Sequence, residues 1–261
     1  MRKLKINTIQ SVEKAITILN VLTSEKEWMS IDELVAQTSF SKTTTYRLLY
    51  TLEKYGLIRY DPVVSKYYLG YKLLEYGDAI TSSQDILQES EFLLLQLYKD
   101  IKQTVLLGVI DDESLVYIFK REKITEGLTL TSSIGRKRSL FYGALGRVAL
   151  AFLPDHKKEK LLNKTLPAWT PKTITDKNQL MIELDKIQKE HVCVESDEAA
   201  TGVTGIASPV FGFHGEIIAV LGVLCLTNQT NEETIQYIKQ QVKDTAEDIS
   251  RNMGYLGNTE T

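Results

Sequence analysis

The sequence predicts an α+β protein: an N-terminal winged helix-turn-helix, a linker helix region, and a C-terminal antiparallel sheet flanked by helices. Residues 1–70 hold three amphipathic helical patterns followed by two short strand-like runs. Residues 71–101 are helical in pattern, with a break expected near Thr81–Ser83. Residues 102–261 alternate strand-like runs with amphipathic helices. We therefore expect two domains joined by a helical connector.

Composition and charge narrow the class of protein. Of 261 residues, 43% are hydrophobic and 25% are charged, as in ordinary globular domains. No apolar run could span a membrane, and the basic start lacks the apolar core of a secretory signal, so we expect a cytoplasmic protein without a membrane partner. The net charge is −3, yet residues 40–72 carry six lysines and arginines against two acidic residues. Such a local excess is typical of a surface that meets a polyanion.

The first two helices carry signals for where they begin. Residues 11–25 have the apolar spacing of an amphipathic helix, and Ser11 is placed to cap it. In the second helix Ser30 is followed three residues later by Glu33, which is the spacing of a capping box. Leu34 then faces inward.

The third helix has two contrasting faces. Ser41 is its expected cap, and Gly56 stands where a left-handed residue commonly ends a helix. At about 3.6 residues per turn, the inward stripe comprises Thr45, Leu48, Leu49 and Leu52. The opposite face comprises Thr43, Tyr46, Arg47, Tyr50 and Lys54, with Lys42 and Thr44 beside it at the front end. Residues 57–60 and 66–70 follow as strands joined by an Asp-Pro loop.

This front end suits the major groove of DNA, where a helix presents its first turns to base edges. Arg47 can donate to guanine, and threonine hydroxyls can bond to bases or phosphates. Arg59 and Lys66 flank the hairpin turn and suit phosphate contacts. Two other interpretations stay open: a solvated helix face in a structural domain, and packing of Tyr46 and Tyr50 on a neighbouring helix or a dimer mate.

The second half reads as strands and helices around one sheet. Strand-like runs cover 104–110, 114–122, 127–133, 192–196, 205–212 and 216–226, and helical patterns cover 140–153, 155–165, 176–190 and 231–253. Turns are expected at Asp111–Glu113 and His214–Glu216.

Several segments resemble the IclR family of transcriptional regulators. They are "SVEKAITIL", "SIDELVAQTSFSKTTTYRLLYTLEKYGLIRYD", "KYYLGYKLLEYG", "TVLLGVIDDESLVYIFKRE", "GRKRSLFYGALGRVALAFL" and "VESDEAATGVTGIASPVFGFHGEIIAVLGV". The resemblance implies a DNA-binding domain over residues 1–70 and a GAF-like, profilin-like effector-binding domain over residues 102–261. It also implies a homodimer or homotetramer controlled by a small organic effector. By the same resemblance Thr44 and Arg47 contact bases, and Ser30, Ser39 and Ser41 contact the DNA backbone.

The resemblance also implies an effector site between the sheet and the helix near Gly143. The corresponding positions are Leu128, Leu130, Ala144, Leu145, Glu195, Gly205, Gly222 and Leu224. Family members that hold small oxo-acids carry polar side chains where this chain has Gly205, Gly222 and Leu224. Because glycines should enlarge the cavity, we expect a bulky or aromatic carboxylate.

Three features of that site stay open from sequence. A buried Glu195 should meet a ligand hydroxyl or amine, or a cation such as Arg147, because an unpaired buried charge is costly; an exposed carboxylate at the strand end is the alternative. The "GALG" glycines serve either ligand approach or tight helix packing. Ser139–Phe141 replaces the family's usual Pro-Leu-His.

Catalysis is the rival class. His156, His191 and His214 lack the spacing of metal ligands, and no nucleophile elbow or phosphate loop is present. Cys193 and Cys225 sit in apolar runs, where small buried hydrophobes are expected. We therefore predict a non-enzymatic DNA-binding transcriptional regulator without a cofactor, which reads a double-stranded operator built as an inverted repeat. The alternative is a ligand- or redox-sensing GAF-like module, or an enzyme, without sequence-specific DNA binding.

Overall fold

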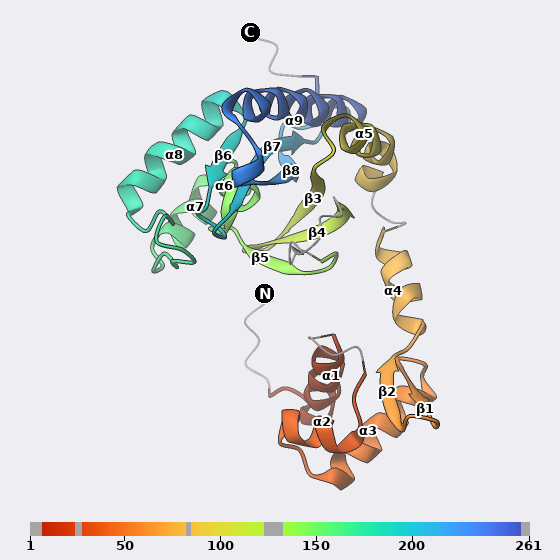
Figure 1. Ribbon diagram of the computed structural model, residues 1–261. Coiled ribbons are helices and arrows are strands. Elements are labelled where there is room, and N and C mark those ends of the chain that lie inside the picture. The colour runs from red at the N-terminus through yellow and green to blue at the C-terminus, as the bar shows by residue number, and fades with distance from the viewer. Residues whose placement is uncertain (1–6, 24–27, 82–84, 123–132, 257–261) are drawn as a thin grey trace. The chain divides into compact units, whose positions relative to one another are not determined.

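The computed structural model describes residues 7–23, 28–81, 85–122 and 133–256. The chain forms two compact units, Met1–Ser83 and Gln84–Thr261, and each is described by itself (Figure 1). Among the helices that the structure describes, none combines the length and the apolar character of a membrane span.

The first unit is a three-helix fold with a β-hairpin. Its elements are α1 (Gln10–Leu22), α2 (Ile31–Thr38), α3 (Lys42–Lys54), β1 (Ile58–Asp61), β2 (Lys66–Leu69) and α4 (Lys72–Thr81). The hairpin strands pair antiparallel, and a bridge from Met29 to Tyr67 adds a third segment beside them. The core of this unit comprises Ile18, Leu22, Met29, Leu34, Leu49, Leu52, Ile58 and Tyr67. The predicted winged helix-turn-helix is confirmed.

Local signals placed the ends of α2 and α3 correctly. Ser30 and Glu33 form the predicted capping box, with the Ser30 amide donating to the Glu33 carboxylate at 2.8 Å. Ser41 caps α3 by accepting from the Thr44 amide at 3.3 Å. Gly56 has φ +70, and the amides of Gly56 and Leu57 donate to carbonyls in the last turn of the helix, the Schellman arrangement.

The predicted cap of α1 is wrong. Ser11 lies inside the helix, and Ile9 is the N-cap without a side-chain hydrogen bond. The amides of Val12 and Glu13 both donate to the Ile9 carbonyl, so the hydrogen-bond ladder starts before the serine. The predicted apolar stripe is also only partly buried, since Val12 and Ile16 are 51% and 50% exposed.

The second unit is a six-stranded antiparallel sheet with helices on both faces (Figure 1). The strands, in the order β5-β4-β3-β8-β7-β6, are β3 (Thr104–Asp111), β4 (Ser114–Arg121), β5 (Lys137–Ser139), β6 (Cys193–Ser196), β7 (Val203–Phe211) and β8 (Ile217–Leu226). The helices are α5 (Asp85–Ile101), α6 (Gly143–Ala151), α7 (Asp155–Leu162), α8 (Lys177–Glu190) and α9 (Glu232–Asn252), and a 3₁₀ turn, Thr227–Gln229, follows β8. One hydrophobic cluster joins the sheet to α6, α7 and α8, and another joins it to α5 and α9.

Most predicted elements of this unit are present. The exceptions are β5, which is too short and too charged for its pattern to signal a strand, and the run 127–133, which lies almost wholly outside the described residues. The predicted break at Thr81–Ser83 also falls largely outside them. The expected turns are confirmed, with Asp112 and Gly215 at φ 57 and 78.

Candidate functional site

The outer face of α3 is open, as its periodicity predicts. Thr43, Arg47 and Lys54 are exposed, and Tyr46 and Tyr50 are 59% and 65% exposed. On the inner face Thr45 and Leu49 are fully buried, Leu52 is 5% exposed, and Leu48 is half-buried. Thr44 is half-buried at the front end, where its hydroxyl accepts from Ser41 at 2.9 Å. Within the described unit, Tyr46 and Tyr50 are therefore not packed on a neighbouring helix.

The serines around α2 and α3 serve local structure first. The hydroxyls of Ser30 and Ser41 are occupied in caps, and Ser39 ends α2 in a left-handed conformation with φ 58. Lys42 pairs with Asp32 at 2.6 Å, but both side chains are largely exposed, at 64% and 75%. Such a surface pair contributes little, so the Lys42 ammonium can exchange Asp32 for another anion.

The hairpin holds its two cations on aromatic rings. The Arg59 guanidinium lies 5.1 Å from the Tyr68 ring centroid and 4.8 Å from that of Tyr71, and it donates to the Tyr71 hydroxyl at 3.2 Å. The Lys66 ammonium lies 4.5 Å from the centroid of Trp28. These contacts restrict both cationic side chains of the hairpin.

The second unit contains a cavity of about 60 Å³ at the start of α6. It is lined by Tyr117, Arg138, Tyr142, Gly143, Ala144, Leu145, Glu195, Ala199, Ala200, Val203 and Leu224. Four of the predicted effector positions are therefore brought together: Ala144, Leu145, Glu195 and Leu224. Glu195, Gly205 and Leu224 form one row across β6, β7 and β8. Leu128 and Leu130 lie outside the described residues.

The glycines do not enlarge this cavity, which corrects the reasoning from sequence. A β-carbon on Gly222 would lie 2.4 Å from the Leu145 side chain, so that side chain already fills the space. A β-carbon on Gly205 would lie 3.0 Å from Glu195 Oε1 and 3.2 Å from the Ala144 β-carbon. Gly146 is required for packing, because its β-carbon would meet the Leu140 carbonyl oxygen at 2.8 Å.

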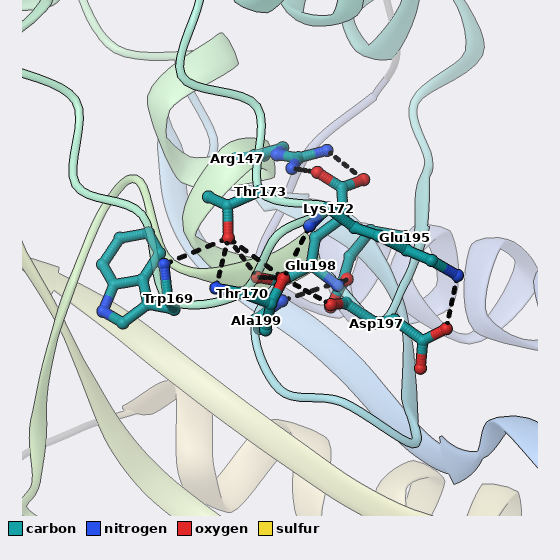
Figure 2. A network of polar contacts seen from close by, with 9 residues as sticks. All are labelled: Arg147, Trp169, Thr170, Lys172, Thr173, Glu195, Asp197, Glu198 and Ala199. Carbon is teal, nitrogen blue, oxygen red and sulfur yellow. Dashed lines mark hydrogen bonds and ion pairs between the residues drawn. The ribbon is translucent and has the colours of Figure 1, made fainter.

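Glu195 is buried and not an exposed strand-end carboxylate. It is 3% exposed, and its Oε2 accepts from the amides of Glu198 and Ala199 at 3.0 and 3.4 Å. Burial raises the pKa of Glu195 to about 7, against the lowering effect of the Glu198 amide and of the nearby Arg147 charge. Of the partners considered for Glu195, Arg147 forms its two-pronged ion pair with Glu198 instead (Figure 2).

Figure 2 shows that a second segment holds the loop after β6. The hydroxyls of Thr170 and Thr173 donate to the Asp197 and Glu198 carbonyls, each at 2.7 Å. Lys172 pairs with the Asp197 carboxylate at 2.7 Å. This network fixes the loop whose Ala199 and Ala200 line the cavity.

Three lining residues with polar side chains escaped sequence reasoning: Tyr117, Arg138 and Tyr142. The Arg138 guanidinium lies 4.9 Å from the Tyr142 ring centroid, and Tyr142 packs edge-on against Trp169 at 5.0 Å. Arg138 also hydrogen-bonds to the Tyr117 phenol, whose pKa is raised to about 12, chiefly by burial. A cation a few residues before the "GALG" helix is the signal that could have found Arg138.

The two cysteines and the potential metal ligands among the described residues were weighed as catalytic or redox sites by their burial and their grouping. Cys193 and Cys225 are both buried thiols, and burial raises the pKa of Cys193 to about 12, so its reactive thiolate is scarce. No group of three or more potential metal ligands occurs within the described part of the chain.

The first unit presents an exposed helix of the recognition type and a hairpin that carries two cations. The second unit holds a small cavity with polar residues in its wall. These features are typical of DNA-binding regulators with a separate ligand-binding domain. The model of the IclR helix-turn-helix domain matches residues 11–62, and that of the bacterial transcriptional regulator IclR C-terminal domain matches residues 78–251. The chain belongs to the IclR family of DNA-binding transcriptional regulators.

Two relatives that are named as transcriptional regulators are similar in sequence to nearly the whole chain. The chain is 31% identical to the HTH-type transcriptional regulator XynR of Escherichia coli over 95% of this chain and 98% of that protein. It is 32% identical to KdgR of Escherichia coli over 95% and 94% of the two chains. These relatives are regulators and not enzymes.

Solved structures share the fold. The crystal structure of Thermotoga maritima IclR covers 95% of this chain and is itself covered completely, with a TM-score of 0.82 and 29% identity. An IclR homologue from Microbacterium hydrocarbonoxydans, in complex with 4-hydroxybenzoate, has a TM-score of 0.81 at 16% identity and covers 93% of this chain and 98% of its own. The predicted fold class is thereby confirmed.

Proposed function

We propose that this regulator reads a double-stranded operator through the open face of α3, with Thr44 and Arg47 contacting bases. The observation that carries the proposal is the exposure of Arg47 beside the front end of a capped helix. Lys42, Thr43, Tyr46, Arg59 and Lys66 and the amides near Ser30, Ser39 and Ser41 then contact the sugar-phosphate backbone.

A homodimer or homotetramer follows from an operator built as an inverted repeat, with half-sites about one helical turn or a multiple apart. The apolar residues Val12 and Ile16 on α1 support self-association, because their side chains are 51% and 50% exposed. Exposed apolar surface of this kind commonly marks a protein interface.

The cavity at α6 is the proposed effector site, and its occupant changes the population of DNA-binding conformations. A carboxylate is supported by the start of α6 at Gly143 and by Arg138 at the wall. An aromatic or bulky acid is supported by the 4-hydroxybenzoate bound to the Microbacterium homologue. Such an acid requires the Leu145 side chain to leave its place over Gly222. The place of action we propose is the cytoplasm, where the operator lies.

The test is selection of DNA from a random pool, followed by binding measurements on the selected and on random duplexes. Arg47→Ala should weaken binding to the selected duplex by about 1–3 kcal/mol and relax the base preference. Lys66→Ala, the matched cation on the hairpin, should weaken all duplexes alike and reduce the salt dependence. Equal losses on selected and random DNA for Arg47→Ala would contradict base reading by this residue.

A further inference from the structure

A second and larger pocket lies in the same unit as the cavity at α6. It has a volume of about 500 Å³, within the range of roughly 300–1,000 Å³ that is usual for small-molecule sites. We call it the β7–α9 pocket; its wall includes His191, Ser208, Phe211, Glu247, Arg251 and Tyr255. None of the described residues lines both spaces, although β7 contributes Val203 to the cavity and Ser208 and Phe211 to the pocket. The two are therefore separate spaces that share one strand.

Three aromatic rings form a continuous row along the β7–α9 pocket. The ring centroid of Phe211 lies 5.1 Å from that of Tyr255 and 5.5 Å from that of His191. Phe152 does not line the pocket, and it packs edge-on against Phe211 at 5.2 Å and against His191 at 5.4 Å. Because Phe152 supports both rings, little ordering is needed when a ligand arrives. A flat aromatic group suits this wall, since aromatic rings pack favourably on one another.

Two long helices end at the β7–α9 pocket. His191 is the C-cap residue of α8, which has 14 residues, and Ser250 and Arg251 belong to the last turn of α9, which has 21. The C-terminal end of a helix carries the equivalent of roughly half a negative charge and is stabilised by a nearby cation. The backbone therefore favours a positively charged group in this pocket.

The side chains of the pocket also favour a cation. Glu247 is exposed and has no ion pair among the described residues, whereas Arg251 is paired with Asp248. Burial and the nearby charge of Lys243 lower the pKa of His191, against a raising effect of Glu247. A neutral imidazole has one nitrogen that accepts a hydrogen bond. Glu247 thus offers a negative charge, and His191 offers an acceptor without a positive charge.

We propose that the β7–α9 pocket is a ligand site of its own and that it binds an aromatic amine in its ammonium form. The aromatic group packs on the rings of Tyr255, Phe211 and His191, and the ammonium group lies toward Glu247 and the ends of α8 and α9. The face of an aromatic ring attracts a cation as well as another ring, so one wall suits both parts of the ligand. The inference goes beyond the proposed function, because it uses neither the cavity at α6 nor the DNA-binding face.

The test is calorimetric titration of the full chain with two matched sets of probes. Phenethylamine, 2-phenylethanol and 3-phenylpropionate form one set, and tryptamine, tryptophol and indole-3-propionate form the other. Within a set the ring and the linker are the same, and only the charge of the end group differs. Butylamine supplies the charge without the ring. In at least one set the ammonium ion should bind roughly fivefold or more tightly than the alcohol, the acid and butylamine, because it alone gains both the ring contacts and the charge contacts.

Variants assign the binding to residues. Glu247→Gln should reduce the preference for the ammonium ion over the alcohol by roughly threefold or more and leave the alcohol unchanged. Tyr255→Leu should weaken every probe that carries a ring by roughly threefold or more. Glu233→Gln and Tyr237→Leu are the matched controls, because both residues are exposed on α9 and neither lines the pocket. Circular dichroism identifies a variant that has not folded, and the exposed Glu247 keeps the test decisive if Tyr255→Leu fails to fold.

The comparison uses only binding that Tyr255→Leu weakens, so that acids bound elsewhere in the chain do not enter it. Three outcomes would overturn the inference: no binding of either ammonium ion, equal binding of the alcohols or acids, or wild-type binding by folded Glu247→Gln and Tyr255→Leu.

Sedimentation of the same proteins tests the other possible occupant of the pocket, a second copy of this chain. A fall in molecular mass for Tyr255→Leu, together with no probe binding to the wild type, would assign the pocket to an interface between copies and overturn the ligand assignment. Operator reading by α3 is measured on DNA, so its success or failure is distinguished from that of the pocket.

Discussion

At the scale of single residues, Glu195 is a buried carboxyl group of the second unit whose pKa is strongly raised. It is 3% exposed, and it faces Arg147 and Glu198 across the loop and Cys193 along its strand. Loss of solvation is the largest influence on its carboxyl group and outweighs the two backbone amides that favour the charged form. The group therefore keeps its proton to a higher pH than an exposed glutamate does.

This raised pKa predicts a pH dependence of stability. Because the folded state binds the proton more tightly than the unfolded chain, stability from this group is greatest below pH 4.5 and is lost as pH rises to about 7. The full loss of unfolding free energy from this group is on the order of 3 kcal/mol. Urea unfolding of the wild type should therefore lose stability between pH 5 and pH 8 relative to Glu195→Gln, measured in parallel. An identical pH profile for the two proteins would argue against the raised pKa.

At the scale of elements, the Arg147–Glu198 pair ties α6 to the loop after β6. Arg147 is 3% exposed and Glu198 is 16% exposed, so the pair is shielded from water. The loop also receives Thr170, Thr173 and Lys172 from the segment between α7 and α8. Three parts of the chain far apart in sequence thus meet beside the cavity (Figure 2).

Breaking this pair from one side should be costly. Arg147→Met leaves Glu198 without its cation and should reduce the free energy of unfolding by about 3–5 kcal/mol, with Arg147→Met/Glu198→Gln recovering part of the loss. Arg251→Met is the matched control, because Arg251 and Asp248 are 65% and 45% exposed, and such a surface pair contributes about 0–1 kcal/mol. Thermal unfolding measures all three variants. Similar losses for Arg147→Met and Arg251→Met would show that burial of the first pair is unimportant.

At the scale of the whole molecule, two separate sets of residues stabilise the two units. The core of the first unit includes Leu49, and the core on the α9 face of the second includes Leu221; both residues are fully buried. The described clusters share no residue. Each unit therefore has an apolar core of its own, which is what defines a domain.

Scanning calorimetry should accordingly show two transitions. Leu49→Ala should lower the stability of the first unit by about 2–5 kcal/mol, shift one transition, and weaken DNA binding while ligand binding persists. Leu221→Ala should shift the other transition and weaken ligand binding. If either substitution moved a single common transition, the two units would have to be regarded as one cooperative system.

Local signals in the sequence determined the elements of the first unit and the open face of α3. Capping residues such as Ser30 and Ser41 and the left-handed Gly56 act within one turn, and an apolar stripe needs only the helical period. The failure at Ser11 has the same origin, because Ile9 begins the hydrogen-bond ladder and makes the serine's hydroxyl unnecessary as a cap.

Only the tertiary structure decided the chemistry of the cavity. Leu145 fills the space over Gly222, Glu198 takes Arg147 away from Glu195, and β5 brings Arg138 to the wall. Each of these contacts joins side chains that are tens of residues apart in sequence, and no local pattern carries that information. Sequence alone determined where α2 and α3 begin and which face of α3 is exposed to solvent, since those are short-range effects. Packing decided which polar groups are paired and which line the cavity, since burial and partnership arise when distant segments come together.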